Sequence, residues 1–230
     1  SGLHAKIADL PEIAAAASSN GAQLFDVRHP TQTFDVGTGV RRSGKRLLAV
    51  GTDCSVGKMY TALAVDAEMR QRGADCDFRA TGQTGIFIAG SGVSVDAVVS
   101  DFISGATEWL VPANAADHWD LVEGQGSLFH PSYAGVTMGL VHGAQPDALV
   151  LCHEPTRTHM RGLPHQALPD IESCIDGHLA AARLTNPGAQ CVGIAVNTSA
   201  MDSAGARADL LLQLSDRFEI PALDPVRDGV

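Results

Sequence analysis

A glycine-rich loop between an apolar strand and a helix constrains the fold of this chain more than any other feature. The loop reads Gly51-Thr52-Asp53-Cys54-Ser55-Val56-Gly57-Lys58-Met59 and follows the apolar run RLLAVG (46–51). Backbone N–H groups of such a loop, together with the positive N-terminus of the next helix, bind phosphate oxygens, and a lysine adds positive charge. The order strand, glycine loop, helix therefore predicts a phosphate-binding loop at the carboxyl end of a buried strand.

Apolar periodicity predicts further strands and helices in alternation around this loop. Strands are expected at 22–27, 46–51, 75–80, 119–124, 147–152, 189–196 and 219–224. Helices are expected at 3–18 (with Asp9 as N-cap), 57–72, 93–111, 133–143, 169–184 and 201–218, with a polar connector at 29–44. This alternation predicts an α/β fold of the P-loop NTPase type, an open and mostly parallel sheet with helices on both faces. Ligands of such sheets bind at the carboxyl ends of the strands.

Charge and cysteine usage exclude several classes of function. The net charge of −10 argues against sequence-independent nucleic-acid binding, and no apolar run is long enough to span a membrane. The five cysteines include no CxxC pair, which favours reduced thiols and a cytoplasmic protein. We expect small-molecule substrates and a homo-oligomer. One basic run, 41–46, is either a solvated linker or a second phosphate contact.

The loop departs from the common G-x-x-x-x-G-K-[ST] pattern at two positions. Five residues separate Gly51 from Gly57, and Met59 replaces the hydroxyl residue that binds Mg²⁺, although Thr61 lies nearby. This pattern favours a ligand whose phosphates are held without being cleaved, such as coenzyme A, over ATP with Mg²⁺. The loop residues 52–59 are the predicted cofactor-binding residues.

Two candidates for proton transfer follow the strand at 119–124. Glu123 is expected close to Lys58, where it is a metal ligand, a general base or the partner of the lysine. His130 follows on the same loop and either transfers protons or is an ordinary loop residue. We therefore predict Glu123 and His130 as catalytic.

Polar residues after two other strands are candidates for substrate binding. Gln83 and Thr84 follow the strand at 75–80 and offer hydrogen bonds to a carboxylate or amide. Arg157 and Arg161 follow the strand at 147–152, and a guanidinium group suits an anionic substrate. His153, His159 and Glu154 match no standard zinc spacing, so no metal is predicted. Asn197, after the strand at 189–196, is a weaker candidate for contact with a nucleotide base.

Taken together, the motifs resemble one family of P-loop proteins. They are GTDCSVGKM, TGQTGIFI, DLVEGQGSLFHP, LVLCHEPTRTHMR and IPALDPVRDG. The family has long been known as a domain of unknown function, and some of its members are assigned as D-glutamate N-acetyltransferases. The loop alone also resembles that of dethiobiotin synthetases. The resemblance implies that residues 1–44 are the tail and linker of an N-terminal Rossmann-like domain and that 45–230 are the P-loop domain.

The resemblance implies transfer of an acetyl group from acetyl-CoA to the amine of an acidic amino acid, D-glutamate, in D-amino acid catabolism. This chemistry needs a base for the ammonium group, a donor for the oxyanion and a cation for the carboxylates. Two alternatives stay open at this point: an ATP- and Mg²⁺-dependent ligase of the dethiobiotin synthetase type, and a nucleotide-binding module without catalysis.

Overall fold

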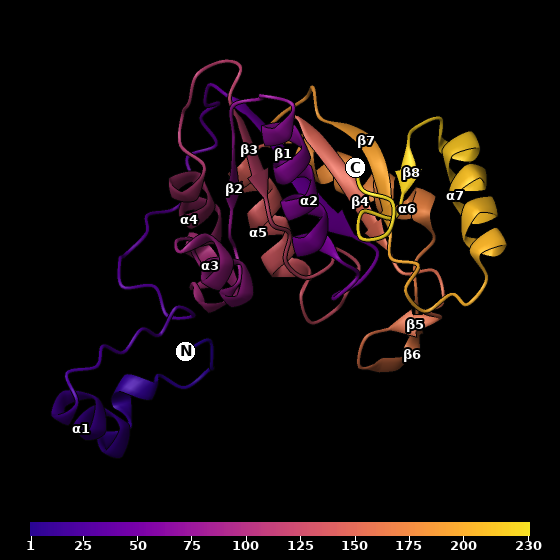
Figure 1. Ribbon diagram of the computed structural model, residues 1–230. Coiled ribbons are helices and arrows are strands. Elements are labelled where there is room, and N and C mark those ends of the chain that lie inside the picture. The colour runs from indigo at the N-terminus through magenta and orange to yellow at the C-terminus, as the bar shows by residue number, and fades with distance from the viewer.

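A six-stranded parallel sheet forms the centre of the computed structural model, which describes all 230 residues (Figure 1). The strand order is β2-β3-β1-β4-β7-β8, with strands β1 (Lys45–Gly51), β2 (Cys76–Arg79), β3 (Trp119–Val122), β4 (Ala148–His153), β7 (Gln190–Val196) and β8 (Ala222–Leu223). The helices are α1 (Pro11–Ser19), α2 (Lys58–Gln71), α3 (Gln83–Ala89), α4 (Ile103–Leu110), α5 (Ala134–Ala144), α6 (Ile171–Ala182) and α7 (Ala204–Phe218). The predicted α/β architecture is thus confirmed.

The central strand β1 is buried on both faces because Leu47, Leu48, Ala49 and Val50 are apolar. Leu48 and Val50 face the cluster that also contains residues of α4, α5 and α6. Leu47 and Ala49 point the other way, into a cluster that contains residues of α2. This period of two places helices on both faces of the sheet.

The strand order brings two loops together at the carboxyl edge of the sheet. Because β1 pairs in parallel with β3, the loop that follows Gly51 lies beside the loop that follows Val122. After β1 the chain crosses to β2 on one side of the sheet, and after β3 it crosses to β4 on the other side. The direction of the connections therefore reverses at the carboxyl ends of β1 and β3. The predicted ligand position therefore lies between the loops after β1 and β3.

The N-terminal segment, residues 1–44, differs from its prediction. Residues 22–27 form no strand, because Asp26 accepts the N–H groups of Ile7 and Ala8 (both 3.1 Å) and no neighbouring strand pairs with this stretch. The helix predicted at 3–18 reduces to a 3₁₀ turn, η1 (Ile7–Asp9), and α1. Leu10, not Asp9, occupies the N-cap, with Pro11 as the first residue of α1. Helix α1 buries no residue and projects from the body of the molecule (Figure 1).

Two other local predictions need correction. The stretch 93–111 contains two 3₁₀ turns, η2 (Val95–Ala97) and η3 (Ser100–Phe102), and only its last part is α-helical. Its first residues do not form a helix because the N–H groups of Val93 and Val95 donate to the chain after β2. The α3 helix and the antiparallel hairpin of β5 (His159–Met160) and β6 (Leu163–Ala167) were not predicted.

The basic run at 41–46 proves to be structural. Arg46 is fully buried, and its guanidinium group donates to backbone carbonyls, including those of Ser43 (2.8 Å) and Pro112 (3.3 Å). Because β1 starts at Lys45 and the glycine loop follows its other end, the run lies away from that loop. It is neither a solvated linker nor a second phosphate contact.

Two further features bear on the earlier expectations. All five cysteines are free thiols. None of the helices combines the length and the apolar character that crossing a membrane requires.

Candidate active site

The glycine loop (residues 51–58) leads directly from β1 into the first turn of α2. Gly57 is the N-cap of α2 and has a φ of +107°, a conformation that side chains disfavour. Lys58 is the first residue of the helix, so its side chain and the free N–H groups of the first turn are at the same end. The loop therefore has the form that a phosphate site requires.

Lys58 is a buried cation without an anionic partner. Its Nζ donates to the backbone carbonyl of Asp53 at 2.9 Å, and no carboxylate oxygen lies within 4.0 Å. Burial lowers the pKa of Lys58 below its ordinary value. Since a bound phosphate would supply the missing negative charge, the lysine is suited to an anionic ligand. The alternative that Glu123 is its ion-pair partner is wrong.

Asp53 and Arg157 hold the glycine loop in place. Arg157 Nη1 donates to Asp53 Oδ2 (2.6 Å) and to the carbonyl of Cys54 (2.7 Å), and its Nη2 donates to the carbonyl of Ser55 (3.3 Å). Asp53 Oδ2 also accepts the backbone N–H of Arg161 at 2.7 Å. The guanidinium of Arg157 is thus engaged by the loop, and a substrate carboxylate would have to displace these bonds.

His130 is buried beside the hairpin that carries Arg161. Its Nδ1 accepts the backbone N–H of Ser132 at 3.2 Å, and its Nε2 lies 3.1 Å from the carbonyl of Arg161. The neutral ring with the proton on Nε2 satisfies both contacts. With only 2% of its surface exposed, His130 holds the hairpin and offers no free nitrogen to a substrate.

Glu123 is a buried carboxylate at the end of β3. Its Oε2 accepts the backbone N–H groups of Thr81 (2.9 Å) and Gly82 (3.1 Å). The first turn of α3 packs onto it so closely that a Cβ at Gly85 would lie 2.3 Å from Oε2. Burial raises the pKa of Glu123, and the two N–H donors offset part of that rise. A carboxylate with a raised pKa is suited to accept a proton near neutral pH.

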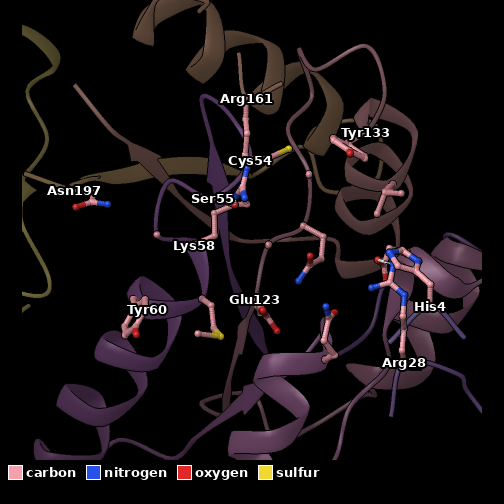
Figure 2. A pocket seen from close by; sticks show the side chains of 18 residues that line it. His4, Arg28, Cys54, Ser55, Lys58, Tyr60, Glu123, Tyr133, Arg161 and Asn197 are labelled. Carbon is pink, nitrogen blue, oxygen red and sulfur yellow. Dashed lines mark hydrogen bonds and ion pairs between the residues drawn. The ribbon is translucent and has the colours of Figure 1, made fainter. Parts of the chain in front are cut away.

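The glycine loop and Glu123 share one cavity of about 810 Å³ (Figure 2). Predicted site residues in its wall are Cys54, Ser55, Gly57, Lys58, Met59, Gln83, Glu123 and Arg161. Thr52, Asp53, Val56, Thr84, His130 and Arg157 do not line it. Thr84 is exposed outside the lining, so its predicted contact with substrate has no support from its position.

Several residues of the cavity wall were not predicted from the sequence. They are His4, Arg28, Tyr60, Asp96, Gln125, Tyr133 and Val136, with Gly124 and Gly126 between them. Gln125 belongs to the glycine-rich stretch already singled out after β3. No local pattern marks His4 or Arg28, because they reach the cavity only through the fold of the N-terminal segment. Figure 2 shows Lys58 and Arg161 on one side of Glu123, and His4 and Arg28 on the other.

A second, largely apolar pocket of about 350 Å³ adjoins the glycine loop. Gly57, Tyr60 and Asn197 line both this pocket and the main cavity. Its other wall contains Pro225 and Val226, whose loop is held by the Asp224 carboxylate through the hydroxyl of Thr198 and backbone N–H groups. A flat ring with a polar edge fits such a pocket, with Asn197 as a hydrogen-bonding group.

One group of residues has the spacing of a metal site but not its chemistry. Side-chain ligand atoms of Asp53, Cys54 and His130 lie within 4.8 Å of one another. However, Asp53 Oδ1 accepts the N–H of Cys54, its Oδ2 accepts from Arg157 and Arg161, and both nitrogens of His130 are engaged. The carboxylate of Asp53 and the imidazole of His130 are therefore not free to bind a cation.

Comparison with known proteins agrees with this architecture. Residues 35–230 match the family model described as domain of unknown function, DUF1611_C, P-loop domain. Residues 1–30 match its companion, described as DUF1611_N, Rossmann-like domain. The chain belongs to the DUF1611 family. The predicted P-loop type of fold is thereby confirmed.

Two relatives of this DUF1611 chain are named D-glutamate N-acetyltransferase. The one from Pseudoalteromonas sp. is 54% identical over 230 residues, covering 100% of this chain and 69% of the relative. The one from Tritonibacter scottomollicae is 57% identical over 229 residues, covering 100% and 68%. A crystal structure of a DUF1611 family protein from Anabaena variabilis superposes with a TM-score of 0.90 at 35% identity, covering 99% of this chain and 67% of that one.

Proposed function

We propose that this DUF1611 chain is an N-acetyltransferase that moves an acetyl group from acetyl-CoA to the amine of D-glutamate. One observation carries the proposal: relatives with that name are 54% and 57% identical to the chain along its whole length. The cavity supports it independently, since the glycine loop with Lys58 and the buried carboxylate of Glu123 line the same space.

The glycine loop and the apolar pocket suit the two parts of the nucleotide end of coenzyme A. Lys58 and the first turn of α2 are the groups for the phosphates, because Lys58 lacks an anionic partner. The pocket between Tyr60, Asn197 and Val226 is the place for the adenine ring. Because the pocket and the main cavity share Gly57, Tyr60 and Asn197, the rest of a long ligand extends from the loop toward Glu123.

Glu123 is the group best placed to act as the general base. The ammonium group of D-glutamate loses two protons as its nitrogen forms the new C–N bond and the C–S bond of the thioester breaks. The leaving thiolate takes up one proton, and Glu123 takes up the other. Its raised pKa favours this uptake, and its two backbone hydrogen bonds keep the carboxylate oriented.

Side chains near the loop argue against the alternative of an ATP- and Mg²⁺-dependent ligase. Met59 stands directly after Lys58, and a thioether is a poor ligand for Mg²⁺. Thr61 does not replace the missing hydroxyl, because its Oγ1 donates to the carbonyl of Gly57 at 3.1 Å and also lies 3.4 Å from the sulfur of Cys152. The loop is therefore better suited to holding phosphates than to cleaving them.

The proposal is tested by incubating the purified chain with acetyl-CoA and D-glutamate. We expect free thiol and N-acetyl-D-glutamate to appear in equal amounts, measured by a thiol reagent and by mass spectrometry. A parallel reaction with ATP, Mg²⁺ and D-glutamate should release no phosphate. Phosphate release without acetyl transfer would replace the proposal with the ligase alternative.

A further inference from the structure

We propose that Arg28, from the N-terminal segment, binds the side-chain carboxylate of the acidic amino acid and thereby determines substrate selectivity. This inference rests on the proposed function. It identifies a residue that lies outside the P-loop domain of the family and far from the glycine loop in the sequence. The inference comes from the burial of Arg28, its unused hydrogen-bond donors and its place in the cavity.

Arg28 is the one buried residue among residues 1–44. It is 8% exposed, whereas the apolar Leu3, Leu10 and Phe25 of the same segment are 62%, 45% and 65% exposed. Arginine is almost never fully buried unless it is paired, and Arg28 has such a partner in Asp96. What points to a function is that this buried arginine lies in the wall of the cavity.

The guanidinium of Arg28 is oriented but not saturated. Its Nη2 pairs with Asp96 Oδ2, and neither Nη1 nor Nε has a hydrogen-bond partner within the chain. Arg157, in contrast, uses both of its Nη atoms on the glycine loop, and Arg46 is surrounded by backbone carbonyls. Arg28 thus has free donors at the cavity, and Asp96 fixes the direction of the group.

A short path of contacts connects Arg28 with the proposed base. Asp96 lies in η2 beside Val95, whose N–H donates to the carbonyl of Thr81 at 3.0 Å. The N–H of Thr81 in turn donates to Glu123 Oε2 at 2.9 Å. Arg28 and Glu123 line the same cavity, and Figure 2 shows their side chains apart from each other in it.

This separation assigns Arg28 to the distal carboxylate of the substrate. The amine must reach Glu123, and the α-carboxylate is attached to the same carbon as the amine. The side-chain carboxylate lies at the other end of the molecule, away from the reacting nitrogen. Arg161 is less suited to this role because it lies on the other side of Glu123, where its Nη1 donates to Ser55 Oγ beside the proposed phosphate site. The charge-assisted bond from Arg28 would distinguish a carboxylate from an amide.

The test compares three substrates in the full chain and in Arg28→Gln. D-Glutamine lacks only the side-chain carboxylate of D-glutamate, and D-isoglutamine lacks only the α-carboxylate. We expect the wild type to prefer D-glutamate over D-glutamine by about 10- to 100-fold in kcat/KM, and Arg28→Gln to reduce that preference to about 1. The preference for D-glutamate over D-isoglutamine and the KM for acetyl-CoA should stay unchanged.

Two control variants separate substrate binding from a structural role. Asp96→Asn removes the negative charge of the partner but keeps a side-chain oxygen that accepts from Arg28 Nη2, so it should keep most of the preference for D-glutamate. Arg72→Gln makes the same change at an exposed arginine directly after α2 and should behave as the wild type. If Arg28 serves only to dock the segment, Arg28→Gln and Asp96→Asn will lower the rates with D-glutamate and D-glutamine alike, which overturns the proposal.

The remaining outcomes are also decisive. A wild type that acetylates D-glutamate and D-glutamine equally well overturns the role of Arg28 while keeping the proposed function. Loss of the preference over D-isoglutamine instead would overturn the assignment to the side-chain carboxylate. If the wild type acetylates neither substrate, the proposed function fails. Calorimetric titration with D-glutamate then tests the role of Arg28 in binding. Equal binding by the wild type and Arg28→Gln, or no binding by either, overturns the inference.

Discussion

The sheet body, residues 45–230, and the N-terminal segment, residues 1–44, are held in place by different interactions. The body buries apolar side chains in three clusters around the parallel strands. The segment buries only Arg28, and apart from Phe34, which packs against the largest cluster and the ring of Trp109, polar contacts fasten it to the body. Among them, Glu108 of α4 accepts the N–H groups of Thr38 and Gly39 at 2.9–3.0 Å. Apolar burial therefore builds the fold, whereas directional polar contacts place the segment against the cavity.

The two regions also contribute different groups to the cavity. The body supplies Lys58 and Glu123, which suit phosphate binding and proton transfer, and these residues follow adjacent strands. The segment supplies His4 and Arg28. The comparison suggests that the body carries the chemistry common to all substrates and that the segment carries selectivity. Changes in the two regions should consequently have different kinetic signatures.

The largest effect is expected from Glu123→Gln in the body. Removing the base should lower kcat by about 10²- to 10⁴-fold for D-glutamate and D-glutamine alike, unlike Arg28→Gln, which changes their ratio. Because the base must be ionised, the wild-type rate should fall with decreasing pH, at a pKa above 4.5, the ordinary value of a glutamate. The pH profile of kcat measures this decrease at low pH, which should be absent from Glu123→Gln. The same decrease in the variant would assign the base to another group.

The next effect compares the stability contributed by each region. Leu48→Ala opens a cavity in the largest apolar cluster and should lower the free energy of unfolding by about 2–5 kcal/mol. Ile13→Ala in α1, where the side chain is 38% exposed, should change it by less than about 0.5 kcal/mol. Urea denaturation of both variants provides the measurement. Similar losses would mean that α1 packs against another surface in solution.

The smallest effect concerns the attachment of the segment. Glu108→Gln weakens the contacts with Thr38, Gly39 and Arg42, so limited proteolysis at residues 31–40 should be about 3- to 10-fold faster, and added salt should have a similar effect. Glu172→Gln, which breaks an exposed pair with Arg217, is the matched control and should cleave as the wild type. Equal cleavage of both variants and the wild type would contradict the polar attachment.

The same difference between the two regions explains which parts of the structure could be predicted from the sequence. The glycine loop was predictable because residues 46–58 contain strand, loop and helix start in one continuous stretch. The proximity of Glu123 and Lys58 was also predictable, since parallel strands end at one edge of the sheet. In contrast, Arg28 meets Asp96 across 68 positions, and neither residue belongs to a motif. The strand predicted at 22–27 failed for a related reason, because a strand pattern alone does not supply a pairing partner.

The roles of Arg157 and His130 could not be predicted from the sequence for another reason. Their residue types suit substrate binding and proton transfer, and both follow strands that end at the active edge. Only the hydrogen bonds of the folded chain reveal that Asp53 and loop carbonyls occupy Arg157 and that Ser132 and Arg161 occupy His130. Composition and spacing identify which groups are near a site, whereas bonding determines which of them are free.

The most direct test of the account is calorimetric titration of the chain with CoA and, separately, with ATP and Mg²⁺. We predict that CoA binds more tightly than ATP with Mg²⁺, and that Lys58→Ala weakens CoA binding by about 10- to 100-fold because it removes the one cation that lacks an anionic partner in the loop. Tighter binding of ATP with Mg²⁺ than of CoA, or CoA binding unchanged by Lys58→Ala, would contradict the account.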